Sequence, residues 1–90
     1  MKKMMHIYYT GSVQGIGFRF TAVRVATSLD LSGWVRNLDD GRVEAVCEGS
    51  EEAIIKFLEK MQDVFGAAAR DHDVVWGDAT GEFERFDIRF

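Results

Sequence analysis

The sequence predicts an α+β fold in which two helices cover one face of a mainly antiparallel sheet. Two stretches of the chain repeat apolar residues at helical spacing, and short segments rich in β-branched and aromatic residues flank them. The expected order is strand, helix, strand, strand, helix, strand, followed by one more strand at the C-terminus. That order is typical of the split βαβ, or ferredoxin-like, arrangement.

The first part of the chain supplies a strand and a helix. Residues 6–10 precede a glycine and carry Ile7 and Tyr9 on one face, which we expect to meet the core. Between residues 18 and 29 apolar side chains recur at helical spacing, which predicts an amphipathic helix. The apolar positions of this helix are Phe18, Ala22, Val25, Ala26 and Leu29.

A hairpin is expected next. Residues 31–36 have the composition of a second strand, and residues 43–48 alternate as a third strand with one buried and one wetter face. Residues 37–41 between them include Asp40-Gly41, a pair that tolerates the positive φ of a tight turn. Cys47 falls on the buried face of the third strand, so we expect it to be a core residue.

The remaining part supplies a helix and two strands. Ser50 can cap the second helix, and the acidic Glu51 and Glu52 favour the positive end of the helix dipole. Residues 73–76 predict a fourth strand, and residues 86–90 alternate as a last strand. The buried stripe of the second helix consists of Ile54, Phe57, Leu58 and Met61.

Length and composition bound the class of protein. The chain has 90 residues and no linker-like stretch, so we expect residues 1–90 to form a single domain. A net charge of −4 argues against nonspecific binding to nucleic acid or anionic membranes, so an anionic ligand needs a local site. A lone cysteine allows neither an intrachain disulfide nor a four-thiolate zinc site. With no recognisable signal peptide or membrane span, we expect a cytoplasmic protein. We expect a monomer, although the edges of a ferredoxin-like sheet can be either shielded or paired.

The segment from Gly11 to Arg19 carries the strongest sign of chemistry. Its glycines lie between the first strand and the first helix, so its N–H groups and those of the first helical turn can converge on an anion. Arg19 adds a planar, permanently charged fork that can make paired hydrogen bonds to phosphate oxygens. The segment lacks the Lys-Ser/Thr pair of a Walker loop, and Phe20 stands where a dinucleotide fingerprint needs glycine.

Two motifs together resemble the acylphosphatase family. Residues 11–19, Gly-Ser-Val-Gln-Gly-Ile-Gly-Phe-Arg, are similar to the phosphate loop of that family. Residues 33–37, Gly-Trp-Val-Arg-Asn, are similar to its second signature. The similarity continues through residues 40–44, Glu48-Gly49 and the segment from Thr80 to the end, so it covers nearly the whole chain.

The resemblance implies a metal-free enzyme without cofactors that hydrolyses the carboxyl-phosphate bond of acyl phosphates and releases inorganic phosphate. In such an enzyme Arg19 and the loop N–H groups hold the phosphoryl group, while the side-chain amide of Asn37 positions the attacking water. This chemistry needs positioning and charge stabilisation more than a strong base. The backbone groups expected to bind phosphate belong to Gln14, Gly15, Ile16, Gly17 and Phe18.

The chain departs from the family pattern in three places. Ser12 stands where many members carry Arg or Lys, which removes one positive charge from the loop entrance. Asp30 stands where glycine is frequent, although aspartate tolerates the left-handed conformation at a small cost in stability. Residues 64–70 contain none of the prolines that are usual after the second helix, so we expect a looser loop there.

Other functions stay open on the sequence alone. A noncatalytic anion-binding or regulatory module would keep the same loop without turnover. A single-stranded RNA binder shares the fold, but its aromatic signature belongs on a central strand, whereas residues 15–20 span a loop and a helix start. Residues 71–73, Asp-His-Asp, could suggest a metal site, but neighbouring strand residues face opposite ways, which favours a solvated loop.

Overall fold

The computed structural model describes residues 2–90 and has strands and helices in the predicted order. None of the helices in these residues is long and apolar enough to cross a membrane. In chain order the elements are β1 (Lys2–Tyr9), α1 (Phe18–Ser28), β2 (Ser32–Asn37), β3 (Val43–Ser50), α2 (Glu51–Phe65), α3 (Ala67–Arg70), β4 (His72–Asp78) and β5 (Phe86–Ile88).

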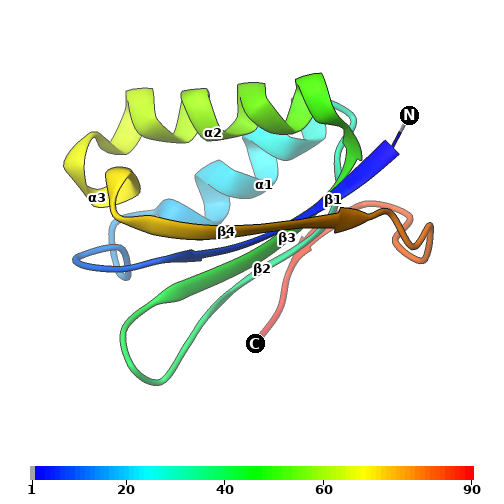
Figure 1. The fold of residues 1–90 in the computed structure, drawn as a ribbon. Coiled ribbons are helices and arrows are strands. Elements are labelled where there is room, and N and C mark those ends of the chain that lie inside the picture. The colour runs from blue at the N-terminus through cyan, green and yellow to red at the C-terminus, as the bar shows by residue number, and fades with distance from the viewer. Residues whose placement is uncertain (1) are drawn as a thin grey trace.

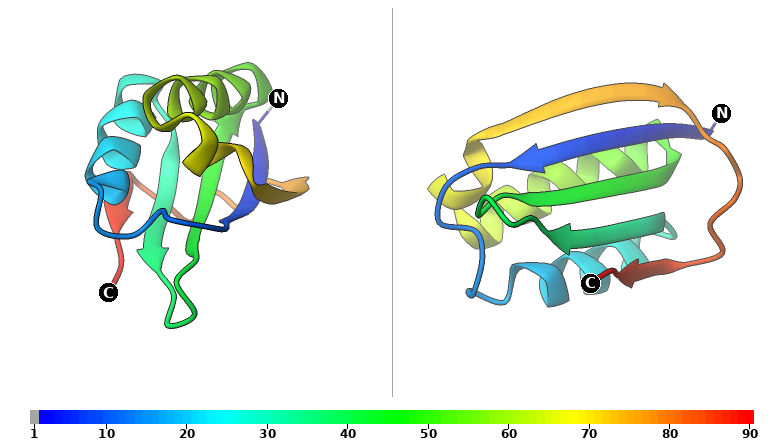
Figure 2. Two further views of the ribbon diagram at one scale, coloured as in Figure 1. Left: turned by 90° about the vertical axis from the view of Figure 1, so that its left-hand side faces the viewer. Right: turned by 90° about the horizontal axis from the view of Figure 1, so that it is seen from below.

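The strands form one sheet in the order β4-β1-β3-β2-β5. Neighbouring strands are antiparallel except β2 and β5, which are parallel. Helices α1 and α2 lie on one face of this sheet (Figure 1), and the view from below shows the opposite face without a covering helix (Figure 2). The predicted ferredoxin-like fold, with two helices on one face of a mainly antiparallel sheet, is confirmed.

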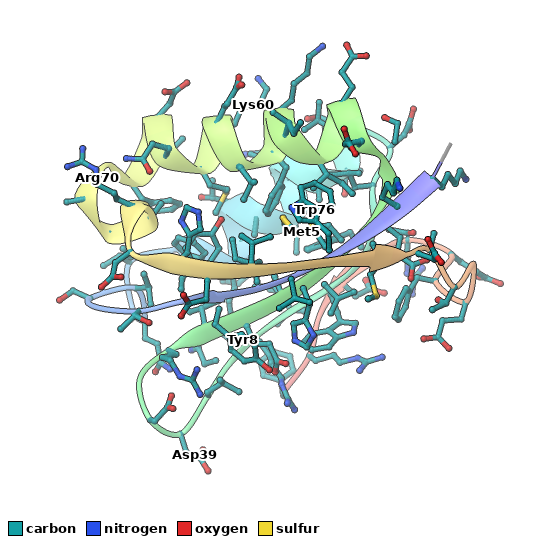
Figure 3. All side chains as sticks on the ribbon, viewed as in Figure 1. Met5, Tyr8, Asp39, Lys60, Arg70 and Trp76 are labelled. Carbon is teal, nitrogen blue, oxygen red and sulfur yellow. The ribbon has the colours of Figure 1, made fainter. Side chains whose placement is uncertain are left out.

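The core lies between the sheet and the two long helices. β1 turns Met5, Ile7 and Tyr9 towards the helices, where all three are buried as the alternation predicts. Figure 3 shows Met5 on the helix side of the sheet and Tyr8 on the opposite side. Cys47 is fully buried in the same core, as expected, and burial raises the pKa of its thiol.

The predicted start of α2 is confirmed in detail. The Ala53 N–H donates a hydrogen bond of 3.1 Å to Ser50 Oγ, so the serine caps the helix as expected. Glu51 and Glu52 occupy the first turn. The helix buries Ile54, Phe57 and Met61 against the sheet, while Leu58 is half-buried at the edge of the stripe.

Element ends differ from the sequence prediction where pairing extends a strand. β1 begins at Lys2 rather than at residue 6, and β4 covers His72–Asp78 rather than residues 73–76, because these two strands pair along their length. The short helix α3 occupies part of the segment in which we expected a loose loop. These corrections depend on contacts between distant segments, which local patterns do not encode.

The expectation that β3 has one wetter face is wrong. Glu44 and Glu48 lie on the face without helices, yet both are buried. The Glu44 carboxylate contacts Arg36 Nε at 2.7 Å and His6 Nε2 at 2.5 Å. Glu48 accepts hydrogen bonds from Thr80 and Gly81 in the segment between β4 and β5. Charged partners and a crossing loop therefore bury both carboxylates on the face that the alternation marks as polar.

Trp76 and Asp30 are two further positions at which the structure bears on the sequence. Trp76 lies opposite the buried Met5 but is itself exposed, because β4 is an edge strand and the helices do not cover it fully. Asp30 does adopt the left-handed conformation that we expected of it, with φ of +56°.

Candidate active site

The loop between β1 and α1 presents backbone N–H groups to solvent. Gly15 and Gly17 have φ values of +78° and +77°, a region in which glycine replaces other residues at little steric cost. Within residues 2–90, no backbone carbonyl accepts a hydrogen bond from the N–H groups of residues 14–17. Val13 is fully buried, and its N–H bonds the Gly11 carbonyl at 2.9 Å, so the base of the loop is anchored.

The N-terminus of α1 is left open, unlike that of α2. Gly17 occupies the capping position and has no side chain that could accept a hydrogen bond from the first turn. The first turn of α1 also contains no acidic residue, whereas α2 has a serine cap and two glutamates. The free N–H groups and the positive end of the helix dipole therefore favour an anion in front of α1.

Arg19 lies in the first turn of α1, where the helix dipole repels a cation. This placement costs about 0.3–1 kcal/mol in helix stability, so it does not serve the helix itself. The side chain is half-buried, and its guanidinium carbon lies 5.5 Å from the centre of the Phe90 ring. The result is a concentration of positive potential beside the glycine loop.

Asn37 approaches the same place from the sheet. It is the last residue of β2 and stands opposite Val43 at the start of β3. Its side-chain oxygen is buried and has no hydrogen-bond partner in the part of the chain that the structure describes. Leaving a buried acceptor unpaired costs about 1–3 kcal/mol, so this side chain is held at a cost that the fold itself does not explain.

One hollow of about 230 Å³ brings these groups together. This volume is several times the roughly 30 Å³ that one water molecule occupies in the liquid. Of the residues predicted for the site, Gln14 and Ile16 do not line the hollow, although they belong to the same loop. The lining residues are Val13, Gly15, Gly17, Phe18, Arg19, Phe20 and Asn37.

Comparisons with known proteins identify the family. The family profile described as acylphosphatase matches residues 5–88. The chain belongs to the acylphosphatase family of enzymes. An acylphosphatase of Roseiflexus is 43% identical over 84 residues, which cover 92% of this chain and 90% of that protein. The crystal structure of the Bacillus subtilis acylphosphatase superposes with a TM-score of 0.89 at 36% identity, covering 98% of this chain and 99% of that one.

One further relative gives a more similar but shorter match. The acylphosphatase of Trichormus variabilis is 56% identical over 50 residues, and the aligned part spans about half of each protein, 56% of this chain and 50% of the relative. The family assignment therefore depends on the matches that extend along nearly the whole chain.

In this acylphosphatase-family chain, the Gln14 side chain joins the loop to the hairpin between β2 and β3. Its Nε2 donates hydrogen bonds to the carbonyl oxygens of Leu38, at 2.7 Å, and Arg42, at 3.0 Å. The same two residues also join the two arms of the hairpin, since the Leu38 N–H donates a hydrogen bond of 2.8 Å to the Arg42 carbonyl oxygen. One amide thus fixes the distance between the glycine loop and the strand end that carries Asn37.

Sequence reasoning missed two contributions to this site. Gln14 was expected to act through its backbone, whereas its side chain makes the contact that holds the loop against the hairpin. From the sequence alone, Phe20 is weighed as a mismatch to a dinucleotide motif and as part of an RNA-binding signature, whereas the structure places it in the lining of the hollow. Gln14 gave no sequence signal, because its acceptors are backbone atoms far along the chain. An exposed phenylalanine on the outer side of a helix is a signal that could have been used.

Two other arginines near the hairpin, Arg36 and Arg42, do not line the hollow. Arg36 follows the strand alternation onto the face without helices and pairs with Glu44, so it does not reach the hollow. Arg42 pairs with Asp40 at 2.8 Å near the hairpin tip, and hydrogen bonds from Arg42 lower the pKa of the Asp40 carboxyl. Within residues 2–90, no group of three or more His, Cys, Asp or Glu side chains is arranged to hold a metal ion.

Proposed function

We propose that this chain hydrolyses acyl phosphates to a carboxylate and inorganic phosphate, with Arg19 and Asn37 as its catalytic residues. The proposal rests on one observation above all: the glycine loop, the arginine and the asparagine line one hollow although they come from different elements. Membership of the acylphosphatase family supports the same chemistry.

The phosphoryl group would lie against the loop between Gln14 and Phe18. Free N–H groups of residues 14–17, together with the open N-terminus of α1, offer donors to its oxygens. The guanidinium of Arg19 would bind two of these oxygens and stabilise the charge that spreads over them in the transition state. Removal of one such oriented donor typically costs about 10²–10³ in rate.

The attacking water would be held by the side-chain amide of Asn37, whose buried oxygen has no partner in residues 2–90. The water oxygen forms a bond to phosphorus while the phosphorus–oxygen bond to the acyl group breaks. The carboxylate leaves with the electron pair of that bond, and one water proton passes to a phosphate oxygen. Because a carboxylate is a good leaving group, positioning supplies most of the required catalysis.

The decisive experiment measures phosphate release from benzoyl phosphate by the purified protein in the presence of a chelator. We expect turnover without added metal, and we expect Asn37→Ala to reduce kcat by at least about 10² while phosphate still binds. Phosphate binding is measured by inhibition or calorimetry. Phosphate binding without any turnover in the wild type would indicate a noncatalytic anion-binding module instead. Equal rates in the wild type and Asn37→Ala would rule out the assigned role of Asn37.

We also propose that the protein acts as a single-domain monomer in the cytoplasm and needs neither nucleic acid nor a membrane. The negative net charge and the lone, buried Cys47 support this view. Sedimentation of the purified protein tests the oligomeric state directly. A dimer at micromolar concentration would contradict the proposal.

A further inference from the structure

Exposed apolar side chains gather around the candidate active site. In residues 2–90, large apolar side chains with substantial exposure include Ile16, Phe20 and Phe90, which are 47%, 73% and 103% exposed. Ile16 lies between the two glycines that line the hollow, Phe20 lines the hollow itself, and the Phe90 ring lies beside Arg19. We call these three side chains the apolar rim. Isolated exposed apolar residues are ordinary, but three of them in or beside residues that line one hollow suggest a contact surface.

The fold gives no packing role to Phe20. The buried positions of α1 are Phe18, Ala22 and Ala26, which face the sheet. Phe20 follows Phe18 by two residues, just over half a helical turn, and therefore points away from the core. Outward positions of a surface helix usually carry polar residues, as Arg24 does in this helix. A phenylalanine at this position gains nothing from the domain's own core.

The chemistry of the hollow indicates what the apolar rim would contact. In-line attack places the leaving group opposite the water, hence on the side of the phosphorus away from Asn37. With the phosphoryl group against the loop and Arg19, the acyl group extends outward past residues that line the mouth of the hollow. Phe20 is the large apolar side chain exposed there.

We propose that Phe20, together with Ile16 and Phe90, forms the acyl-binding surface and gives this protein a preference for acyl phosphates with aromatic or bulky apolar acyl groups. This inference rests on the proposed function and specifies its substrate class. Carbon atoms of the rim offer no partner for a charged acyl chain, whereas apolar acyl groups gain by leaving water. A small acyl group such as acetyl covers little of the rim and gains correspondingly little.

The test compares kcat/KM for benzoyl phosphate and acetyl phosphate in the wild type, Phe20→Ala and Phe20→Leu. The measured quantity is kcat/KM for benzoyl phosphate divided by kcat/KM for acetyl phosphate. The two substrates differ in intrinsic reactivity, but this difference is the same for every variant and so cancels when the ratios of two variants are compared. We expect Phe20→Ala to lower this ratio about tenfold, mainly through KM for benzoyl phosphate, and Phe20→Leu to retain most of it. Val64→Ala is the matched control, since Val64 is 59% exposed on α2 and does not line the hollow.

The outcomes separate the two proposals. Hydrolysis of both substrates with the same ratio in the wild type and Phe20→Ala would overturn the acyl-binding role and leave the proposed function intact. An equal fall of the ratio in Val64→Ala would overturn that role as well. Failure of the wild type to hydrolyse either substrate would overturn both proposals. Because Phe20 is largely exposed, its truncation removes little packing, and a thermal melt of each variant confirms that it is folded.

Discussion

The side-chain amide of Gln14 donates a hydrogen bond of 2.7 Å to the carbonyl oxygen of Leu38, the residue that follows Asn37. This contact joins the loop proposed to hold phosphate to the strand end proposed to hold water. The two halves of the candidate active site come from separate elements, so their spacing depends on such a link. A shift of about 1 Å between reacting groups can cost about 10² in rate.

We therefore expect Gln14→Glu to reduce kcat/KM for benzoyl phosphate by about tenfold to a hundredfold. A carboxylate has nearly the same shape as the amide but cannot donate to the carbonyls of Leu38 and Arg42, which it would instead repel. The control is Gln62→Glu, because Gln62 Nε2 donates to the Gly66 carbonyl at 3.0 Å at the end of α2, away from the hollow. If both variants lost activity equally, the effect of Gln14 would be one of general stability.

Replacement of Arg19 should raise stability while it removes activity. A cation in the first turn of α1 opposes the helix dipole, so Arg19→Gln should raise the free energy of unfolding by about 0.3–1 kcal/mol in phosphate-free buffer. Added phosphate should raise the melting temperature of the wild type, and of the variant by much less, because only the loop N–H groups and the N-terminus of α1 are left to bind the anion. Arg24→Gln, in the middle of the same helix, serves as control, with phosphate stabilisation retained. A phosphate-dependent shift of the same size in Arg19→Gln as in the wild type would exclude the guanidinium from the anion site.

Glu48 should make the stability of the protein depend on acid pH. Burial raises the pKa of this carboxyl, but hydrogen bonds from Thr80 and Gly81 outweigh burial and hold the pKa below its ordinary value. A folded-state pKa below the unfolded one stabilises the protein above the unfolded pKa, and this stabilisation is lost as pH falls through the folded pKa. Glu48→Gln should therefore lower the free energy of unfolding by about 1–3 kcal/mol at neutral pH and flatten its decline below about pH 4.5.

Chemical denaturation of both proteins between pH 7 and pH 3 measures this dependence. Glu59→Gln is a suitable control, because Glu59 is exposed on α2. Parallel pH curves for the wild type and Glu48→Gln would show that the carboxylate does not hold the segment after β4 in the way described.

Gly33 should tolerate no side chain. A Cβ added there would lie 1.9 Å from the Val46 carbonyl oxygen on β3, and the φ of Gly33 is +134°. We expect Gly33→Ala to destabilise the protein by about 3 kcal/mol or more, as seen when strain and a backbone clash combine. Gly41→Ala is the matched comparison, because Gly41 also has positive φ, +94°, but an added Cβ would meet nothing within 4 Å. Gly41→Ala should lower the free energy of unfolding by only about 1–2 kcal/mol. Thermal or chemical unfolding of both variants measures the difference.

Local patterns predicted the elements and one half of the site. The helical spacing from Phe18, the Ser50 cap and the alternation of β1 depend on neighbouring residues, and each is confirmed. The glycines before Arg19 likewise indicated an anion-binding helix start from sequence alone. The roles of Arg19 and Asn37 stay predictions, although both residues line one hollow.

What the sequence by itself determined was the order of the elements, the family and the residue types at the loop, because these depend on short-range spacing and on motifs. Only the tertiary structure decided that Glu44 and Glu48 are buried, that Gln14 reaches the hairpin and that Phe20 stands at the mouth of the hollow. These features depend on pairing between segments far apart in the chain. Such pairing arises only when the whole sheet assembles and its core excludes water. No local sequence pattern indicates which side chains then come into contact.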